Sequence, residues 1–561
     1  MRITGARAIM EAFVAEEVGT IFGYPGGAIM PTYDALYGYK DKIHHVLVRH
    51  EQGAGHAAQG YAMTTGKVGV CLVTSGPGAT NLVTPIADAM IDSIPLVCIS
   101  GQVHADLVGT DAFQEVDIIG VTTPITKWNY QVTRASEIPH VLAKAFYIAR
   151  TGRPGPVLID ITKNAQADYL DFSYKIIHSL TSYKPNTTPN LKQISTAAKL
   201  INESKKPLVL MGHGVLIGNA EEEMKEFAEA SQVPVASTLL GLSVFEKKHP
   251  LFVGMLGMHG NYAPNILTNQ ADLIIALGMR FDDRVTSRLS GYAKKAKVIH
   301  IDIDPAELNK NVEATVPIVA DVKEALTALI PKLKSIDRKG WLDEFKKLEK
   351  QEVEKVITAQ TQPKKGAITM GETVKLLSDK TDGQAIVAAD VGQHQMVAAR
   401  YYDFKKSHSW INSAGAGTMG YALPAALGAQ VGNPKKTVLS ISGDGGFQMT
   451  LQELATIHQE QIPLKIIVLN NNYLGMVRQW QELFFEERYS FVDLINPNFV
   501  TVAQGFGIKG QCVEKRADLN GAIDTMLAHC GPYLLEVVVE KKGKVFPMIP
   551  TGAAVDEIRL E

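Results

Sequence analysis

The sequence has little cysteine and no long apolar run, and each scarcity excludes a class of protein. Its four cysteines show no Cys-x-x-Cys spacing, which argues against a disulfide framework and predicts buried thiols in a reducing cytoplasm. No apolar stretch reaches the length that spans a membrane. The first residues lead directly into an amphipathic helix pattern, so we expect no signal or transit peptide and a cytoplasmic location.

An excess of charge of one sign is also absent. The net charge is −2, so the basic surface of a nucleic-acid-binding protein is not expected. Hydrophobic residues make up 46% of the chain and charged residues 20%, which are values of ordinary globular proteins. A length of 561 residues predicts several domains.

Predicted strands and helices alternate along the chain, as is typical of parallel α/β sheets. The polar, proline-containing residues 182–192 and the charge-rich residues 332–365 interrupt this alternation. We therefore predict an α/β protein whose domains each have a mainly parallel sheet flanked by helices, at 1–181, 190–340 and 366–561. The middle domain has the strand pattern of a dinucleotide-type sheet but no Gly-x-Gly-x-x-Gly, so its residues alone indicate a nucleotide only weakly.

The most informative segment is 441–472. Asp444 and Asn471 each follow a short β-type run, and an expected helix at 451–461 separates them. This order places both oxygen donors at the carboxyl ends of parallel strands, where open α/β sheets bind ligands. The neighbouring glycines leave room for a diphosphate, and a magnesium ion held largely by phosphate oxygens suits the donors. An ordinary βαβ unit with a glycine-rich turn is the alternative interpretation.

Glu51 is the main candidate residue in the first domain. It lies where a strand at 45–48 passes into a helix rich in small residues, which let another backbone or a ring pack closely. Glycine-rich turns follow predicted strands at 24–28 and 74–81. Taken alone, Glu51 is better explained as a structural residue, a helix N-terminal glutamate stabilised by the helix dipole.

The combination of the Gly-Asp-Gly…Asn-Asn-Asn segment, Glu51 and these turns resembles the thiamin diphosphate (ThDP) enzymes. Residues 109–117, 150–161 and 280–286 narrow the resemblance to the catalytic large subunit of the acetohydroxyacid synthase (acetolactate synthase) family. The similarity extends in order over nearly the whole chain.

The resemblance implies ThDP, Mg2+ and FAD as cofactors. Mg2+ would be bound by Asp444, Asn471 and the carbonyl of Tyr473. The residues implied to contact ThDP are Tyr24, Pro25, Pro77, Asn81, Val391, Gly392, Gln393, His394, Gly417, Met419, Gly443, Asp444, Gly445, Gly446, Asn471, Tyr473, Leu474, Gly475, Met476 and Val477. Those implied to contact FAD, which takes no net redox part, are Arg153, Gly212, Gly214, Thr238, Leu239, Met258, His259, Gly260, Gly278, Arg280, Asp283, Arg284 and Asp302.

The resemblance also implies roles in the reaction. Glu51 would hydrogen-bond the aminopyrimidine ring, Met419 would hold the cofactor bent, and Trp480 would favour 2-ketobutyrate as the second substrate. The further residues implied, at the oxyanion region and along the substrate channel, are Gly27, Phe113, Gln114 and Lys163.

The implied reaction decarboxylates pyruvate and joins the remaining two-carbon unit to a second 2-keto acid. Pyruvate as acceptor gives 2-acetolactate and 2-ketobutyrate gives 2-aceto-2-hydroxybutyrate, both used in branched-chain amino acid biosynthesis. In this family Glu51 and the metal motif belong to different chains, so a homodimer or tetramer is expected, with a small regulatory subunit as a further possible partner.

Three alternatives stay open on the residues. The first is a catabolic acetolactate synthase without FAD, and the second is a pyruvate oxidase or 2-keto acid decarboxylase of similar domain order. The third is a non-enzymatic scaffold, which would require a broken metal or glutamate site, and neither is broken in this sequence. Four positions depart from the usual family pattern and bear on substrate preference and herbicide sensitivity: Asp106, Trp128, Val397 and Arg478.

Overall fold

The computed structural model describes residues 1–561 and contains three six-stranded sheets, one in each predicted domain. Within these sheets every pair of neighbouring strands is parallel; only the short β1 (Arg2–Thr4) and β8 (Tyr169–Asp171) pair antiparallel, outside them. The predicted α/β class with mainly parallel sheets is therefore confirmed.

The first sheet has the strand order β3-β2-β4-β5-β7-β6. Its strands are β2 (Thr20–Gly23), β3 (His44–Leu47), β4 (Gly69–Val73), β5 (Leu96–Gln102), β6 (Trp128–Val132) and β7 (Pro156–Thr162). The helices of this domain are α1 (Gly5–Ala15), α2 (Met30–Leu36), α3 (Glu51–Thr65), α4 (Pro77–Thr80), α5 (Val83–Asp92), α6 (Ile118–Thr122), α7 (Ile138–Arg150) and α8 (Lys163–Ala167).

The middle sheet has the order β11-β10-β9-β12-β13-β14. Its strands are β9 (Pro207–Met211), β10 (Val235–Ser237), β11 (Phe252–Met255), β12 (Leu273–Leu277), β13 (Lys297–Asp302) and β14 (Val316–Val319). The accompanying helices are α9 (Leu191–Glu203), α10 (His213–Ile217), α11 (Glu221–Ser231), α12 (Tyr262–Thr268), α13 (Asp283–Thr286) and α14 (Val322–Leu329).

The third sheet has the order β16-β15-β17-β18-β20-β19. Its strands are β15 (Ile386–Ala389), β16 (Trp410–Asn412), β17 (Val438–Gly443), β18 (Lys465–Asn470), β19 (Lys509–Val513) and β20 (Tyr533–Val538). Its helices are α17 (Met370–Lys380), α18 (Gln393–Tyr401), α19 (Ala422–Gly432), α20 (Asp444–Thr450), α21 (Glu453–Gln459), α22 (Gly475–Phe484), α23 (Phe499–Gly505) and α24 (Arg516–Ala528).

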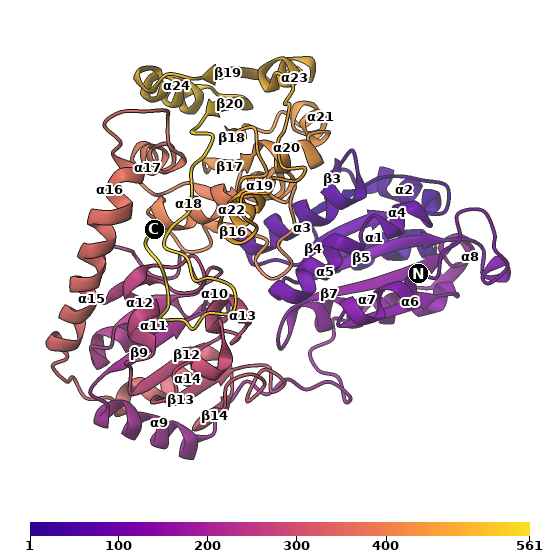
Figure 1. The fold of residues 1–561 in the computed structure, drawn as a ribbon. Coiled ribbons are helices and arrows are strands. Elements are labelled where there is room, and N and C mark those ends of the chain that lie inside the picture. The colour runs from indigo at the N-terminus through magenta and orange to yellow at the C-terminus, as the bar shows by residue number, and fades with distance from the viewer.

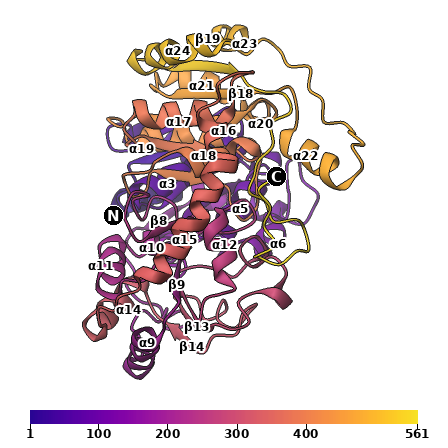
Figure 2. The same ribbon diagram turned by 60° about the vertical axis from the view of Figure 1, so that its left-hand side comes forward.

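Two segments connect the middle and third domains, and both can be followed in Figure 1 and Figure 2. The first is helix α15 (Lys339–Glu352), continued by a π-helical turn at Val353–Ile357 and α16 (Thr358–Thr361). The second is the segment after β20, drawn in yellow, which returns to the middle domain. There Ile549, Val555 and Ile558 are buried in the same apolar cluster as Leu208 and Ile274 of the middle sheet.

The first and third domains meet through helices α3 and α19, which pack backbone against backbone. A Cβ atom added to Gly428 would overlap the carbonyl of Ala57, and one added to Gly60 would overlap the carbonyl of Ala425. The small residues that follow Glu51 in the sequence therefore serve close helix packing, as expected. The buried apolar cluster formed here is continuous between the two domains.

The helix expected at 451–461 is present as α21. The sequence did not predict the additional helix α20, which begins at Asp444 and ends at Thr450. Cys71 and Cys98 are buried free thiols as expected, but Cys512 and Cys530 are exposed. No helix has the length and apolarity needed to cross a membrane.

Candidate functional site

The two predicted metal donors lie at one edge of the third sheet. Strands β17 and β18 are parallel neighbours, with Gly443 opposite Leu469. Asp444 follows the first strand and Asn471 the second, so both side chains project from carboxyl ends of adjacent strands. Both residues are buried. The strand–helix–strand arrangement predicted from the sequence is thus present and brings its two oxygen donors to the same place.

Glycines around Asp444 leave the backbone bare where a ligand would approach. A Cβ atom at Gly443 would lie 2.7 Å from His394 Nδ1, and one at Gly445 would lie 2.7 Å from Leu474 Cδ2. Larger residues would fill the small cavity at this edge. Its wall consists of Met370, Val391, Gly392, Gln393, His394, Met419, Gly443, Asp444, Gly445, Gly446, Leu469, Asn471, Tyr473, Leu474, Gly475, Met476 and Val477.

His394 provides the test of whether this cavity suits a diphosphate. The side chain is 6% exposed, and its Nε2 atom is buried without any hydrogen-bond partner. Burial lowers the pKa of His394 to about 3, so the imidazole is neutral. A buried, unpaired ring nitrogen is costly unless a ligand satisfies it, and a phosphate oxygen would do so. The residues present therefore fit a diphosphate.

Asn496 is a residue of this site that the sequence did not reveal. Its Nδ2 atom donates to Asp444 Oδ2 at 2.7 Å, to Asn470 Oδ1 at 3.0 Å and to Asn472 Oδ1 at 3.2 Å. It thereby orients the carboxylate, whose pKa burial raises to about 6. The segment around it, Asn-Pro-Asn, has the composition of a turn, and nothing in it indicates a contact with Asp444.

The protein offers few ionisable ligands for a metal at this edge. No group of three or more histidine, cysteine, aspartate or glutamate side chains is placed to hold an ion anywhere in the chain. The donor set here is one carboxylate, one amide and a backbone carbonyl, which are hard oxygen ligands. Such a set suits Mg2+ when a bound phosphate group supplies further oxygens.

The predicted residues of the first domain gather at the carboxyl ends of β2, β3 and β4. Asn81 Nδ2 donates to Glu51 Oε2 at 2.8 Å, which joins the turn after β4 to the start of α3. The turn at 24–28 is tied to the same place, because Ala28 N donates to Thr74 Oγ1 at 3.3 Å. A Cβ atom at Gly76 would be 2.9 Å from the carbonyl of Gln114, so that residue also lies here.

Within one chain, the first-domain group and the third-domain group are not brought together. The small cavity beside Asp444 is not lined by any of the first-domain candidates, which are Tyr24, Pro25, Gly27, Glu51, Pro77, Asn81, Phe113, Gln114 and Lys163. Phe113 is 87% exposed, and Lys163, at the start of α8, is also exposed. The predicted pyrimidine side of the ThDP site therefore lies outside the diphosphate cavity of the same chain.

A second, larger cavity of about 880 Å3 lies where the three domains meet. This volume is near the upper end for small-molecule sites, as a dinucleotide requires. The predicted flavin residues in its wall are Arg153, Gly214, Thr238, Leu239, Met258, His259, Gly260, Gly278, Arg280, Arg284 and Asp302. The two other predicted flavin residues, Gly212 and Asp283, do not line this cavity.

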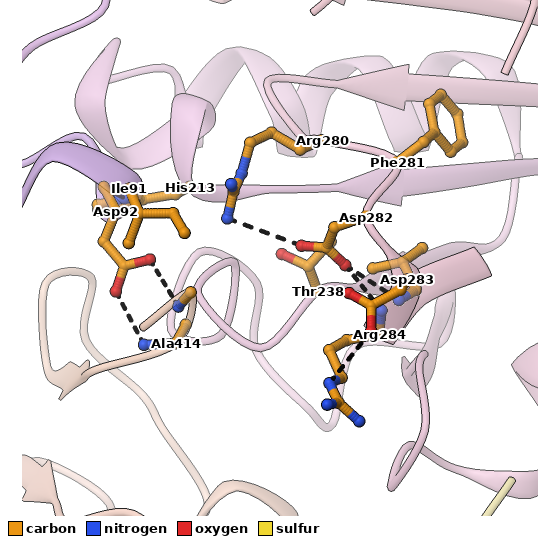
Figure 3. A network of polar contacts seen from close by, with 12 residues as sticks. Ile91, Asp92, His213, Thr238, Arg280, Phe281, Asp282, Asp283, Arg284 and Ala414 are labelled. Atoms are coloured by element: carbon orange, nitrogen blue, oxygen red, sulfur yellow. Dashed lines mark hydrogen bonds and ion pairs between the residues drawn. The ribbon is translucent and has the colours of Figure 1, made fainter. Parts of the chain in front are cut away.

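Backbone packing and side-chain exposure explain why Gly212 and Asp283 lie outside the cavity wall. A Cβ atom on Gly212 would overlap the carbonyl of Gly278, so this glycine lets β9 and β12 end close together. Asp283 is exposed, whereas its neighbour Asp282 lines the cavity. Arg280 Nη2 lies 3.7 Å from Asp282 Oδ2, while Arg284 Nε pairs with Asp283 at 3.6 Å (Figure 3).

The wall of the large cavity carries polar groups of both signs. Arg153 Nη1 pairs with Glu307 at 2.8 Å, and burial raises the pKa of Asp302 to about 7. His259 Nδ1 is buried without a partner, and burial lowers the pKa of this histidine to about 4. An unpaired buried donor or acceptor of this kind is available to a polar ligand, so the residues fit a dinucleotide cofactor.

The two cavities adjoin. Five residues line both: Val391, Gly392, Met419, Met476 and Val477. Gly417, which has a φ of +65°, and Trp480, which is 36% exposed, line the large cavity beside them. The region predicted for the reacting part of ThDP is therefore continuous with the region predicted for the flavin.

The four departures from the family pattern lie outside both cavities. Trp128 is stacked on Tyr130, Val397 is part of the buried core, and Asp106 is exposed. Arg478 is buried; it pairs with Glu482 at 3.0 Å and its guanidinium lies 5.0 Å from the ring of Tyr473. It stabilises the segment between the metal motif and Asn496.

Comparison with known proteins identifies the family of the chain. Residues 3–121, 194–329 and 390–537 match the N-terminal TPP binding domain, the central domain and the C-terminal TPP binding domain of thiamine pyrophosphate enzymes. The acetolactate synthase large subunit of Corynebacterium glutamicum is 47% identical over 569 residues, covering 100% of this chain and 90% of that protein.

Relatives from two other organisms are similar over comparable lengths. The acetolactate synthase isozyme 2 large subunit of Escherichia coli is 45% identical over 557 residues, covering 99% of each protein. The probable acetolactate synthase large subunit of Methanocaldococcus jannaschii is 44% identical over 563 residues, 99% of this chain and 95% of that one. The chain therefore belongs to the acetolactate synthase large-subunit family of thiamin diphosphate enzymes.

Proposed function

We propose that this chain forms 2-acetolactate from two molecules of pyruvate, and 2-aceto-2-hydroxybutyrate from pyruvate and 2-ketobutyrate, in branched-chain amino acid biosynthesis. The observation that carries the proposal is the paired site at β17 and β18, with Asp444, Asn471 and the unpaired His394 in one cavity. Similarity to acetolactate synthase large subunits along the whole chain supports the choice among ThDP enzymes.

ThDP would be held by its diphosphate at this cavity and by its pyrimidine ring at the first-domain group. When bound, its thiazolium carbon supplies the nucleophile and the electron sink for the decarboxylation. The proposed role of Glu51 is to share a proton with the aminopyrimidine ring, and Asn81 holds its carboxylate in place. Met419, at the wall shared by the two cavities, would support the bend between the two rings.

Mg2+ would be bound by Asp444, Asn471 and the carbonyl of Tyr473, with the diphosphate completing its oxygen ligands. FAD is proposed for the large cavity, whose volume and polar wall suit a dinucleotide. This cavity supports the biosynthetic enzyme over the FAD-independent catabolic synthase. Trp480 and Val477 at its edge are proposed to contact the second 2-keto acid.

Two chains are proposed to form the active unit. Glu51 and Asn81 do not line the diphosphate cavity of their own chain, and Phe113 is almost fully exposed. A partner chain would bring its first-domain group, including Gly27, Gln114 and Lys163, to this cavity. The relatives' description as large subunits supports a small regulatory subunit as a further partner. We also propose domain limits at 1–181, 190–340 and 366–561 and a cytoplasmic location.

The direct test is a product assay with purified protein, pyruvate, ThDP, Mg2+ and FAD, omitting each cofactor in turn. Acetolactate is measured as acetoin after acid treatment. We expect product that depends on all three cofactors. Product without any requirement for FAD would identify the catabolic type, and acetaldehyde or oxygen uptake in place of acetolactate would refute the proposed reaction.

A further inference from the structure

The end of helix α5, residues Ile91–Ser93, touches all three domains. It belongs to the first domain, and all three of its residues line the large cavity. Figure 3 shows Ile91 and Asp92 between His213 of the middle domain and Ala414 of the third. No motif in the sequence singles out this turn, and the proposed reaction has so far given it no role.

The carboxylate of Asp92 fixes a loop of the third domain. Ala414 N donates to Asp92 Oδ2 at 2.8 Å, and Gly415 N donates to Asp92 Oδ1 at 2.9 Å. Asp92 is 2% exposed, so these two hydrogen bonds are shielded from water. A Cβ atom on Gly415 would lie 2.8 Å from Ile91 Cγ1, which shows how closely the loop lies on the helix end.

A second carboxylate on the same helix secures the same loop. Ser413 Oγ donates to Asp88 Oδ1 at 2.7 Å and accepts a hydrogen bond from Thr418 N at 2.8 Å. The loop continues through Gly417 to Met419, the two residues proposed to contact ThDP. The backbone of these ThDP residues is therefore anchored on a helix of the first domain.

The other side of the α5 end is bound by residues of the large cavity. His213 Nδ1 lies 3.0 Å from the carbonyl oxygen of Asp92. Arg153 Nε donates to Ser93 Oγ at 2.8 Å, and Arg153 Nη2 donates to the carbonyl of Ile91 at 3.3 Å. Both His213 and Arg153 line the cavity proposed for FAD.

We propose that Asp92 is a positioning residue that couples the flavin cavity to the loop bearing Gly417 and Met419. A ligand that orders Arg153 and His213 holds the α5 end, and the α5 end holds Ala414 and Gly415. The inference rests on the proposed binding of FAD and ThDP. By linkage, each cofactor then tightens the binding of the other by the same factor.

Asp92→Asn is the substitution that tests this coupling. It keeps the size of the side chain but leaves one oxygen acceptor where two backbone N–H groups need one each, so one of them loses its partner. Asp160→Asn is the matched control, because Asp160 is also a buried carboxylate of the first domain. Its partners, Ser100, Gln102 and Gln131, all lie within that domain.

The measurement is the dissociation constant of FAD, obtained by flavin fluorescence with cofactor-depleted full-length protein, with and without saturating ThDP and Mg2+. For the wild type and for Asp160→Asn we expect ThDP to tighten FAD binding by at least about fivefold. The ratio compared is the dissociation constant of FAD without ThDP divided by that with ThDP. For Asp92→Asn we expect this ratio to fall to about two or less.

Two results would overturn the coupling while leaving the cofactors in place: an unchanged ratio in Asp92→Asn, or a wild-type ratio of one. A wild type that binds no FAD would instead reject the flavin proposal, and this inference with it. If Asp92→Asn fails to fold, Ser413→Ala removes a single hydroxyl from the same loop. Its ratio is expected to fall below that of the wild type, and an unchanged ratio counts against the coupling.

Discussion

At the metal edge, which is the end of β17 and β18 that carries Asp444 and Asn471, one side chain holds another in the position needed to bind the metal. Asp444 is held by the Asn496 amide, which also binds two other asparagine carbonyls. Residues that orient metal ligands in this way commonly contribute one to two orders of magnitude in metal affinity. The Asn496 amide should therefore affect how tightly the protein binds Mg2+.

Asn496→Ala is expected to raise the Mg2+ concentration needed for half-maximal activity by about 10- to 100-fold, because the Asp444 carboxylate loses its orienting donor. Activity at saturating Mg2+ should recover largely. The measurement is acetolactate formation over a Mg2+ titration. Asn498→Ala is the control: Asn498 caps α23 through Thr501 N, at 2.8 Å, so it should cost stability without changing the Mg2+ requirement. Equal Mg2+ curves for wild type and Asn496→Ala would contradict the assigned role.

Asp160 predicts a pH dependence of stability. Burial raises its pKa in the folded protein to about 6, above the usual value of 3.8, so between these values the folded state binds more protons than the unfolded state. The free energy of unfolding therefore falls as pH rises from about 4 to about 6, by up to roughly 3 kcal/mol. Asp160→Asn should remove this part of the dependence.

The comparison is made by denaturant unfolding of wild type and Asp160→Asn at several pH values. The asparagine can keep the local hydrogen bonds, because its oxygen accepts from Gln102 and Gln131 and the Ser100 hydroxyl can accept from its amide. Parallel pH profiles for the two proteins would show that Asp160 does not titrate as described.

At the scale of elements, the contact between α3 and α19 determines how the first and third domains sit together. Gly428→Ala is expected to destabilise the protein by about 3 kcal/mol or more, because its Cβ would overlap the carbonyl of Ala57 and the two helices would have to separate. Gly521→Ala in α24 meets no atom within 4 Å and should be neutral or slightly stabilising.

Thermal unfolding of the two glycine variants tests this difference. A Gly428→Ala protein as stable as Gly521→Ala would mean that the helix contact yields easily and does not fix the domains. Because α3 begins at Glu51, the displaced helix should also lower activity in Gly428→Ala, whereas Gly521→Ala should keep it.

Much of the element layout could be predicted from the sequence, since the strand expected at 45–48 and the helix expected at 451–461 are local patterns that the structure contains. The contacts between distant elements could not be predicted from the sequence. Asn496 and Asp92 act on residues far away in the chain, and only the folded sheets bring them there. Gly212 and Asp283 show the same limit: the motif was found, but which of its members face the cavity depends on backbone packing.

At the scale of the whole molecule, two chains are needed to complete one ThDP site in our proposal. Mixing two inactive variants tests this directly. Glu51→Gln chains keep an intact metal edge, and Asp444→Ala chains keep an intact glutamate, so a mixed dimer contains one complete site. If subunits exchange freely, activity should recover to about a quarter of the wild-type value.

The control is each variant alone, which should be inactive while keeping its fold by circular dichroism. Incubation of the mixture under conditions that block subunit exchange should leave it inactive. Subunit exchange can be demonstrated with tagged chains. If exchange is complete and no activity is recovered, Glu51 and Asp444 of one chain belong to the same active site.

The returning segment has a consequence for how the protein is made. Ile549, Val555 and Ile558 complete the apolar core of the middle domain, yet they are synthesised after the entire third domain. At ordinary translation rates the middle sheet waits on the order of tens of seconds for these residues. During that time part of its apolar surface is uncovered, so the nascent middle domain is a natural client for a chaperone until its last residues arrive.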